Sequence, residues 1–491
     1  MEYILWHNAD WTRFVIDIPD SISAAQVIRG QPVAYQLLSC PPQKKEWGNN
    51  EKASVTNFSV KAQGRHDDVA KVICEAHGEM KNAMQGRKWC NDRFLGRRAN
   101  YKLLDLLLQN LVDGHQYTQT IEIQEPVEPN TADVQVRITP AFQAWRPTVR
   151  VINDCKTRGL SMITNNHVNA DLTRLLSTTS EPKEVFKRLF YNPNPHAVKL
   201  TIELRPNDQE YIAIPHPHFW IPPRATFLLS DCCEGDLFHQ SVKEMHKKYG
   251  HAQLFDLVLM DPPWPNKSAE NSGNYKTFRF VEDMRQMWSA MSLEQYIAPG
   301  GIVAVWITNR ELVRDEVLGP GGLFARWGVC LIEEWYYLKT TKTGDELCDL
   351  RDQFRKPYET LLVGKKTNPR LTNSIKTRVF AGVPDLHSRK PVVKEMLELI
   401  IGKEDGQYAA LEIFARACTS GWMSWGNEVI KHNWERCWVK KVTDERREQI
   451  AEEKKTRAEA KKRGENKETK SIDFSTQSVK AGEKRKASDL E

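Results

Sequence analysis

The sequence predicts an α/β protein whose second half is built on a mostly parallel sheet. Between about residues 214 and 439, short apolar runs alternate with segments that carry apolar residues at helical spacing, as in parallel strands joined by crossover helices. One apolar run, Phe255-Asp-Leu-Val-Leu-Met260, leads directly into Asp261-Pro262-Pro263-Trp264. No predicted strand is followed by G-x-G-x-x-G, so the usual dinucleotide-binding signature is missing.

The individual elements follow from the same patterns. Strands are expected at residues 226–229, 255–260, 302–307, 331–338, 359–363 and 410–414, and helices at residues 281–297 and 392–401. Residues 1–195 mix alternating strand-like stretches with helical ones and predict an accessory α/β region for RNA binding or substrate positioning. We therefore predict three parts, with the catalytic candidate at residues 196–441 and a charged tail at residues 442–491.

Composition indicates a soluble protein and excludes some classes. The 491 residues carry a formal net charge of +6, which is compatible with a polyanionic partner without identifying one. No apolar run approaches the ~20 residues that a membrane-spanning helix needs. The 10 cysteines contain no C-x-x-C pair, which argues against a zinc ribbon or a disulfide framework and favours a reducing compartment.

The C-terminal tail has a composition of its own. From residue 442 it contains strong helix formers without an apolar face and then a Ser/Lys/Glu-rich end, so a frayed helix followed by disorder is expected. The runs Lys461-Lys462-Arg463 and Lys484-Arg485-Lys486 fit a bipartite nuclear import signal, and they fit solvated charge equally well.

The turn at Asp261–Trp264 carries the strongest chemical signal. Ligands of open α/β sheets bind at the carboxyl ends of strands, where this turn falls. An amino group conjugated to a base becomes nucleophilic when acceptors hold both of its N–H bonds, and the Asp261 carboxylate and the Pro262 carbonyl can do so. Pro262 and Pro263 stiffen the turn, and Trp264 offers a ring for stacking, typically worth ~1–3 kcal/mol per base. The structural alternative is a strand-ending turn with a core tryptophan.

Several segments in one order resemble the MT-A family of N6-adenosine methyltransferases, and within it the branch called methyltransferase-like protein four. They are Ile221-Pro-Pro-Arg-Ala-Thr-Phe-Leu-Leu-Ser-Asp231, residues 256–264 with Asn266-Lys267-Ser268, His387-Ser-Arg-Lys-Pro391, Leu411-Glu-Ile-Phe-Ala-Arg416 and Gly421-Trp-Met-Ser-Trp-Gly-Asn-Glu-Val-Ile430. The resemblance covers residues 214–431 and implies a Rossmann-like fold in a permuted order. It also implies S-adenosylmethionine as cofactor and adenine N6 as target.

Carried over position by position, the resemblance implies a set of cofactor contacts. They are Asp231, Cys232, Asp261, Lys390, Arg416, Gly426, Asn427 and Glu428. A cation such as Lys390 suits the carboxylate of an amino acid tail, and amide or carboxylate groups suit ribose hydroxyls. Taken singly, Lys390 and Arg416 could equally be ordinary surface or ion-pair residues.

Two further clusters are candidates for contacts with the substrate. A Gly/Asn/Ser-rich loop after the catalytic turn carries Asn266, Lys267, Ser268, Tyr275, Lys276 and Arg279. Where the family continues with basic residues, this loop has Ala269-Glu-Asn-Ser-Gly-Asn-Tyr275. Residues 86–101 alternate cations with aromatics, which suits either phosphates and stacked bases or a solvated helix face.

The sequence therefore predicts a methyltransferase that uses S-adenosylmethionine and modifies N6 of adenosine or 2′-O-methyladenosine in RNA, with a small nuclear RNA as expected target. The alternatives are an N6-adenine methyltransferase of DNA, a catalytically inactive RNA-binding scaffold, and methylation of another planar nitrogen. The expected partner is RNA or DNA, with no membrane and no metal. The expected location is the nucleus, with the cytoplasm as alternative, and the chain could act as a monomer or with an unidentified subunit.

Overall fold

The computed structural model describes most of the chain in separate segments. These are residues 2–45, 60–95, 104–105, 108, 117–123, 136–145, 148–153, 161–163, 189–205, 218–265, 278, 280–352, 356–367, 374–386 and 388–441. The described residues up to Val439 belong to one compact unit. The predicted tail at residues 442–491 lies outside the described residues.

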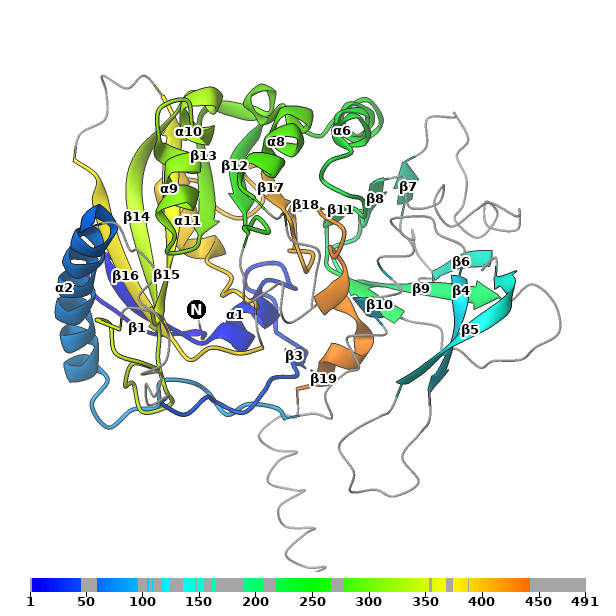
Figure 1. Cartoon of the computed structure of the whole chain (residues 1–491). Coiled ribbons are helices and arrows are strands. Elements are labelled where there is room, and N and C mark those ends of the chain that lie inside the picture. The colour runs from blue at the N-terminus through cyan, green and yellow to red at the C-terminus, as the bar shows by residue number, and fades with distance from the viewer. Residues whose placement is uncertain are drawn as a thin grey trace, which may run out of the picture. The chain divides into compact units, whose positions relative to one another are not determined.

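Among the described residues, twelve strands form one large sheet (Figure 1). In spatial order they are β1 (Ile4–His7), β2 (Arg13–Ile16), β16 (Lys376–Gly382), β14 (Val329–Lys339), β15 (Tyr358–Lys366), β13 (Ile297–Ile307), β12 (Phe255–Met260), β17 (Ala410–Ile413), β18 (Met423–Trp425), β11 (Thr226–Leu228), β8 (Leu189–Tyr191) and β7 (Ser161–Ile163). Smaller sheets pair β10 (His218–Ile221), β9 (Val198–Arg205) and β6 (Thr148–Asn153), then β4 (Tyr117–Ile123) with β5 (Val136–Trp145), and β3 (Tyr35–Leu37) with β19 (Trp438–Lys440).

The centre of the large sheet is parallel. Strands β13, β12, β17, β18 and β11 run in one direction, while β15 is antiparallel to both β13 and β14. The predicted α/β class with a mostly parallel sheet is therefore confirmed. The strand order also departs from the order along the chain, because β17 and β18 lie between β12 and β11.

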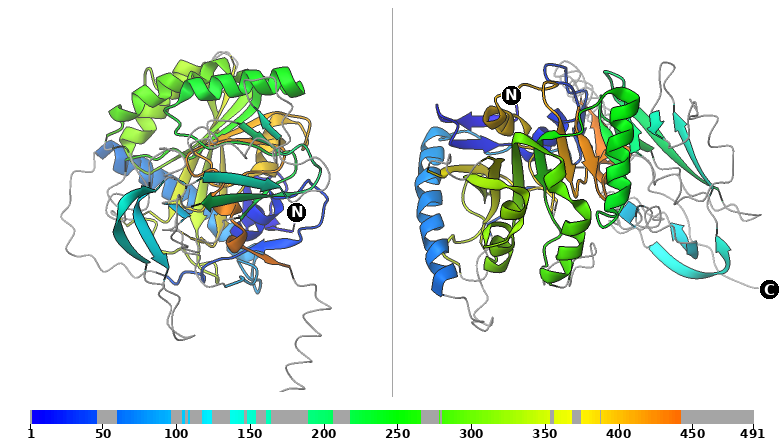
Figure 2. Two further views of the ribbon diagram at one scale, coloured as in Figure 1. Left: turned by 90° about the vertical axis from the view of Figure 1, so that its right-hand side faces the viewer. Right: turned by 90° about the horizontal axis from the view of Figure 1, so that it is seen from above.

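Helices cover both faces of the sheet (Figures 1 and 2). They are α1 (Ile18–Ala24), α2 (Val60–Ala83), α6 (Gly235–Tyr249), α8 (Arg285–Met291), α9 (Glu311–Leu318), α10 (Leu323–Trp327) and α11 (Lys394–Ile401), with 3₁₀ turns at Glu282–Met284, Leu293–Gln295, Lys431–Asn433 and Glu435–Cys437. In β12, Leu257 and Leu259 pack into the core that contains α1 and α11. Val258 and Met260 pack into the opposite core with α6, α8, α9 and α10, because successive strand residues point to opposite faces.

The helix predicted at residues 281–297 is wrong in extent. The segment contains two 3₁₀ turns around α8, and Ile297 already begins β13. Ser292 ends α8 in a left-handed conformation with φ 42°, which an α-helix cannot continue. Apolar periodicity persisted across this break because both sides bury their side chains in the same core.

The first strands of the chain complete the edge of the large sheet. β2 pairs in parallel with β16, and β1 pairs with β2. α2 packs on the same region, and its Ile73 and Met80 share a core with Val379. Part of the predicted accessory region thus belongs to the same sheet as the predicted catalytic part, and the division at residue 195 stays a prediction.

A close contact between α6 and α8 gives a test of this packing. A Cβ on Gly235, the first residue of α6, would lie 1.9 Å from the carbonyl oxygen of Ala290. We expect Gly235→Ala to lower the free energy of unfolding by ~1–3 kcal/mol or more, because the backbone must move. The control is Gly78→Ala in α2, where nothing lies within 4 Å of the added methyl group. Gly78→Ala should raise stability by ~0.5–1 kcal/mol, and thermal unfolding that ranks the two variants in the opposite order would contradict the packing.

Candidate active site

Four parallel strands end side by side at one edge of the sheet. Leu228 of β11 is the register partner of Trp425 of β18, Ile413 of β17 pairs with the same Trp425, and Met260 of β12 pairs with Ile413. Neighbouring strands are ~4.8 Å apart, so this row of strand ends is roughly 14 Å wide. The chain segments that leave these four strands carry most of the residues that the sequence singled out.

Lys390 joins two carboxylates at this edge. Its Nζ lies 3.2 Å from Asp261 Oδ2 and 3.0 Å from Glu359 Oε2, and 5.5 Å from the centre of the Trp306 ring. Burial disfavours the ammonium, but Asp261 and Glu359 outweigh burial and raise the pKa of Lys390. Burial would raise the pKa of Glu359, yet Lys390 and Lys339, whose Nζ lies 2.6 Å from Glu359 Oε1, hold it well below its usual range.

The strand register explains why these side chains meet. Leu259 is the partner of Glu412 on the neighbouring strand, and Asp261 lies two residues beyond Leu259, so Asp261 and Glu412 lie on the same face. Glu359 lies two residues before Leu361, which packs into the same core as Leu259. Because β15 is antiparallel to β13, the start of β15 lies at the edge where β12 and β13 end.

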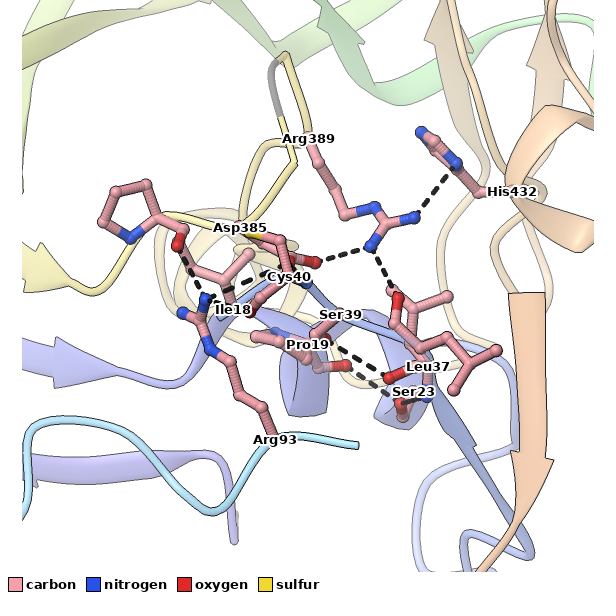
Figure 3. A network of polar contacts seen from close by, with 12 residues as sticks. Ile18, Pro19, Ser23, Leu37, Ser39, Cys40, Arg93, Asp385, Arg389 and His432 are labelled. Atoms are coloured by element: carbon pink, nitrogen blue, oxygen red, sulfur yellow. Dashed lines mark hydrogen bonds and ion pairs between the residues drawn. The ribbon is translucent and has the colours of Figure 1, made fainter. Parts of the chain in front are cut away.

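The loop before Lys390 is fixed by a buried polar network that reaches into the N-terminal part of the chain (Figure 3). Asp385 accepts a hydrogen bond from the Cys40 amide at 2.9 Å and from Arg389 Nη1 at 2.5 Å. Arg93 Nη1 donates to the Cys40 carbonyl at 3.1 Å, and Arg389 Nη2 lies 3.5 Å from His432 Nδ1. Burial, followed by the charge of Arg389, lowers the pKa of His432 well below its usual range, so its imidazole is neutral.

Glu412 is a third carboxyl group at this edge, and no sequence motif assigned it a role. Burial, followed by the negative charge of Asp261, raises the pKa of Glu412 from 4.5 to about 8, although a hydrogen bond with Thr419 opposes the shift. At neutral pH Glu412 therefore holds a proton beside the ionised pair of Asp261 and Lys390. A glutamate inside the apolar strand Ala410–Ile413 was the signal that could have found it.

These side chains line a cavity of about 80 Å³. Its walls include Asp261, Trp306, Lys390, Glu412, Phe414, Arg416, Thr419 and His432. The side chain of Asp261 is 30% exposed and that of Lys390 is 22% exposed, so the corner at the end of β12 opens to its surroundings. The structure thus brings together Asp261, Lys390 and Arg416 of the predicted residues.

Trp264 differs from its predicted state. Only 4% of its surface is exposed, and it packs in the core with Trp288 at 5.9 Å between ring centres. Its Nε1 donates a hydrogen bond to the Trp306 carbonyl at 2.7 Å, and its amide donates to the Pro262 carbonyl at 2.8 Å. In this structure Trp264 therefore fastens the turn at residues 261–264 to β13, and its ring is not the open stacking face that the sequence suggested.

Arg416 and Glu428 are paired with each other. Arg416 Nε lies 3.0 Å from Glu428 Oε2, while Glu428 Oε1 lies 2.7 Å from Lys431 Nζ. Gly426 is explained by packing, because a Cβ there would lie 3.2 Å from the backbone nitrogen and oxygen of Ala415. Asn427 follows directly and is half-buried. These residues leave β17 and β18 at the edge that also holds Asp261.

Asp231 and Cys232 follow the end of β11, at the far side of the row. Asp231 is exposed, and its Oδ1 accepts a hydrogen bond from the Cys233 amide at 2.8 Å. Cys232 is 4% exposed, and burial raises the pKa of its thiol well above the usual value. Because the thiol is buried and neutral, a ligand at this turn can contact the backbone of Cys232 but not its side chain.

The predicted substrate contacts divide into two groups. Asn266, Lys267, Ser268, Tyr275, Lys276 and Arg279 lie outside the described residues. In the segment at residues 86–101, Trp89 is 3% exposed and stacks edge-on against His77. Arg93 lies in the buried network of Figure 3. The aromatic ring of Trp89 and the guanidinium of Arg93 are therefore held inside the fold, whereas Arg87 and Lys88 are exposed, and the described part of this segment is not helical.

The donors and acceptors at this edge fit the chemistry of S-adenosylmethionine. A sulfonium and an α-ammonium suit the carboxylate of Asp261, and an α-carboxylate suits the ammonium of Lys390. Asn427 and Glu428 provide an amide and a carboxylate of the kind that bind ribose hydroxyls. Lys390 and Lys339 balance the carboxylates of Asp261 and Glu359, so these four side chains together carry no net charge. The edge therefore suits a zwitterion better than a strongly charged anion.

Two features are absent from the described residues. No group of three or more His, Cys, Asp or Glu side chains in this part of the chain is arranged to hold a metal ion. Within the same residues, no helix combines the length and the apolar character needed to cross a membrane.

Comparison with known proteins identifies the class of domain that this edge belongs to. Residues 255–428 match the family model described as MT-A70, so this segment is an MT-A70 family domain. The match includes Asp261, Glu359, Lys390 and Glu412. Asp231 and Cys232 lie before it. The family resemblance seen in the sequence is thereby confirmed.

Individual relatives are also named as methyltransferases. The chain is 38% identical over 209 residues to the N6-methyladenosine RNA methyltransferase MTA1 of Cryphonectria parasitica. The aligned residues make up 42% of this chain and 61% of the relative. It is 32% identical over 228 residues to the human N(6)-adenine-specific methyltransferase METTL4, covering 43% of each chain. A Caenorhabditis elegans protein named DNA N6-methyl methyltransferase is 31% identical over 213 residues, 43% of this chain and 53% of its own length. The matches thus span about half of the relatives' lengths.

The buried proton of Glu412 predicts a dependence of stability on pH. A carboxyl group whose pKa is higher in the folded state stabilises the fold below its unfolded pKa of 4.5, and this contribution is lost as the pH rises towards about 8. Relative to Glu412→Gln, the wild-type chain should lose up to ~1.4 kcal/mol of unfolding free energy per pH unit across that window. The measurement is urea unfolding of both proteins from pH 5 to pH 8.

The matched control for this series is Glu294→Gln, because Glu294 is exposed. The difference in unfolding free energy between Glu294→Gln and the wild type should stay constant from pH 5 to pH 8. A constant difference for Glu412→Gln as well would show that Glu412 is ionised in the folded protein and would contradict the buried proton.

Proposed function

We propose that this chain is an S-adenosylmethionine-dependent methyltransferase that methylates N6 of adenine in RNA. The observation that carries the proposal is the Asp261 carboxylate at the end of β12, which is 30% exposed, lines a cavity and is held 3.2 Å from Lys390. The membership of residues 255–428 in the MT-A70 family supports it.

The residues of the turn act on the amino group of the substrate. S-adenosylmethionine supplies the methyl group on an activated sulfonium. Asp261 accepts one N–H bond of N6 and the Pro262 carbonyl accepts the other, which frees the nitrogen lone pair for attack. The Pro262 carbonyl already accepts the Trp264 amide at 2.8 Å, but a carbonyl oxygen has a second lone pair for the base. With the cofactor bound, the nitrogen–carbon bond would form as the sulfur–carbon bond breaks, and the extra N6 proton would pass to solvent.

Trp264 and Lys390 position this acceptor pair. The hydrogen bond from Trp264 Nε1 to the Trp306 carbonyl fixes the turn against β13. Lys390 orients the Asp261 carboxylate from one side, so that the carboxylate can point its other oxygen at the amino group. Preorganisation of this kind is worth more at a partly buried site than in water.

The remaining predicted residues belong to the cofactor in this proposal. Lys390 takes the α-carboxylate, while Asn427 and Glu428 take the ribose hydroxyls. Arg416 holds Glu428 in place at 3.0 Å. Asp231 and the backbone of Cys232 take the adenine end, since they follow β11 at the far side of the row of strand ends.

RNA is the proposed substrate, with a small nuclear RNA and a 2′-O-methyladenosine target as the narrower expectation. The name of the Cryphonectria relative, an RNA methyltransferase, supports RNA. DNA is the second candidate because the Caenorhabditis relative is named for DNA. We further propose that the protein works in the nucleus and that it acts as a monomer.

Replacing Asp261 tests the proposal directly. Asp261→Asn keeps the size of the side chain but removes the charge-assisted acceptor, so kcat should fall by ~10²–10³-fold or more. Binding of S-adenosylmethionine should remain largely intact because Lys390 keeps Glu359 as a partner. Transfer of labelled methyl groups to RNA and titration calorimetry with the cofactor measure the two effects separately.

Asp68→Asn is the matched control, because Asp68 is an exposed aspartate in α2 with 78% of its side chain accessible. It should retain full activity. Paired RNA and DNA oligonucleotides of one sequence, with and without a 2′-O-methyl group at the adenosine, identify the substrate. Normal turnover by Asp261→Asn would refute the assigned role, and transfer to DNA alone would refute the choice of RNA.

A further inference from the structure

A second cavity lies at the opposite edge of the same four parallel strands. Its volume is about 420 Å³, against about 80 Å³ for the cavity beside Asp261. It is lined by the first residues of β11, β12, β17 and β18, namely Thr226, Phe255, Ala410 and Met423. Figure 1 shows these strands side by side, with α6 next to them. A strand of six residues rises ~3.3 Å per residue, so roughly 16 Å of sheet separates the two edges.

The cavity has an apolar floor and a polar rim. Val242 and Met245 of α6 lie with Phe255 and Met423 in its floor, and all four are buried. Arg224, Tyr191, His251 and Gln407 provide a guanidinium, a hydroxyl, an imidazole and an amide. Pockets of ~300–1,000 Å³ with this combination are typical of sites for small organic ligands. Tyr191, Arg224 and His251 precede residue 255 and so lie outside the MT-A70 match.

Arg224 is placed by an unusual backbone. Its φ is 54°, a left-handed conformation that a side chain disfavours by about 1–2 kcal/mol. The conformation is held by buried Asn192, whose Nδ2 donates to the carbonyls of Ile221 at 3.2 Å and Pro222 at 2.8 Å, and by the Arg224 amide, which donates to the Asn194 carbonyl at 3.2 Å. Residues kept in strained conformations concentrate at ligand sites.

The charges in the wall favour an anion. Asp256 is already paired, since Lys403 Nζ lies 2.9 Å from its Oδ1 and the Ala409 amide donates to its Oδ2 at 3.0 Å. The guanidinium of exposed Arg224 has no hydrogen-bond or ion-pair partner among the residues that the structure describes. The unbalanced charge of the wall is therefore positive and lies at the rim.

The aromatic rings favour a flat, partly apolar group. Tyr191 and His251 pack edge to face with 4.9 Å between ring centres. Burial lowers the pKa of His251, so its imidazole is neutral and presents one donor and one acceptor. Burial raises the pKa of Tyr191, although the charge of Arg224 opposes the shift, so its hydroxyl remains a donor. A heterocyclic base has the donors, acceptors and flat faces that these groups bind.

We propose that this cavity binds a nucleoside monophosphate, with the phosphate on Arg224 and the base over the apolar floor beside His251. The nucleotide is either free in solution or one unit of a bound RNA strand, because both present the same chemistry. The site is separate from the methyl-transfer edge and does not depend on the proposed reaction.

Calorimetry with the full chain tests the site, with adenosine 5′-monophosphate, adenosine and a 5′-phosphorylated RNA tetranucleotide as probes. Arg224→Gly removes the guanidinium and places at the left-handed position the residue that favours it, so the melting temperature should stay the same or rise. Binding of the monophosphate should weaken at least tenfold in Arg224→Gly, to the level of adenosine with the wild type. Lys247→Ala, which removes an exposed cation from α6 outside the cavity, is the matched control and should bind as the wild type does.

The probes also identify the source of the nucleotide. A loss confined to the monophosphate supports a free nucleotide, and a loss with both the monophosphate and the tetranucleotide supports one unit of an RNA strand. The proposal is overturned if neither probe binds more weakly to Arg224→Gly than to the wild type. It is also overturned if S-adenosylmethionine displaces the monophosphate competitively, because the probe then occupies the edge beside Asp261.

Discussion

The placement of Lys390 between Asp261 and Glu359 is the interaction on which the candidate active site depends. Three carboxyl groups crowd one edge of the sheet, and they cannot all be ionised there without compensation. Lys390 and Lys339 balance the charges of Asp261 and Glu359, while Glu412 keeps its proton at neutral pH. As a result, the partly exposed Asp261 carboxylate is held in a fixed orientation beside a cavity.

The segment that carries Lys390 takes its shape from distant parts of the chain. Asp385 and Arg389 are bound through Cys40, Arg93 and His432, which come from opposite ends of the described sequence (Figure 3). A buried polar network is stable only when all of its groups have hydrogen-bond partners. This network therefore couples the N-terminal segment to the edge that holds Asp261. The N-terminal segments that carry Cys40 and Arg93 therefore help to shape the candidate site.

Local patterns predicted the central strands and the catalytic turn, because apolar runs and an Asp-Pro-Pro-Trp sequence are visible without tertiary context. They did not predict the partners of these residues. Glu412 is the polar residue of the short apolar strand β17, and Glu359 is the second residue of β15. Only the pairing of β12 with β17 and the start of β15 at the same edge bring them to the edge that holds Asp261. Trp264 was assigned an open ring face because sequence cannot show that the Trp306 carbonyl and Trp288 cover it. The helix predicted at residues 281–297 is interrupted because Ser292 adopts a left-handed backbone conformation.

A double-mutant cycle between Asp261 and Lys390 measures the interaction that holds this edge together. Unfolding free energies of the wild type, Asp261→Asn, Lys390→Gln and the double variant, obtained in the absence of ligand, give the coupling between the two side chains. We predict that the two substitutions are non-additive by ~1–3 kcal/mol, because Lys390→Gln leaves Asp261 without its cation, whereas Asp261→Asn leaves Lys390 paired with Glu359 alone. Effects that add to within ~0.5 kcal/mol would contradict this prediction, since the ion pair with Lys390 would then not hold Asp261 in place.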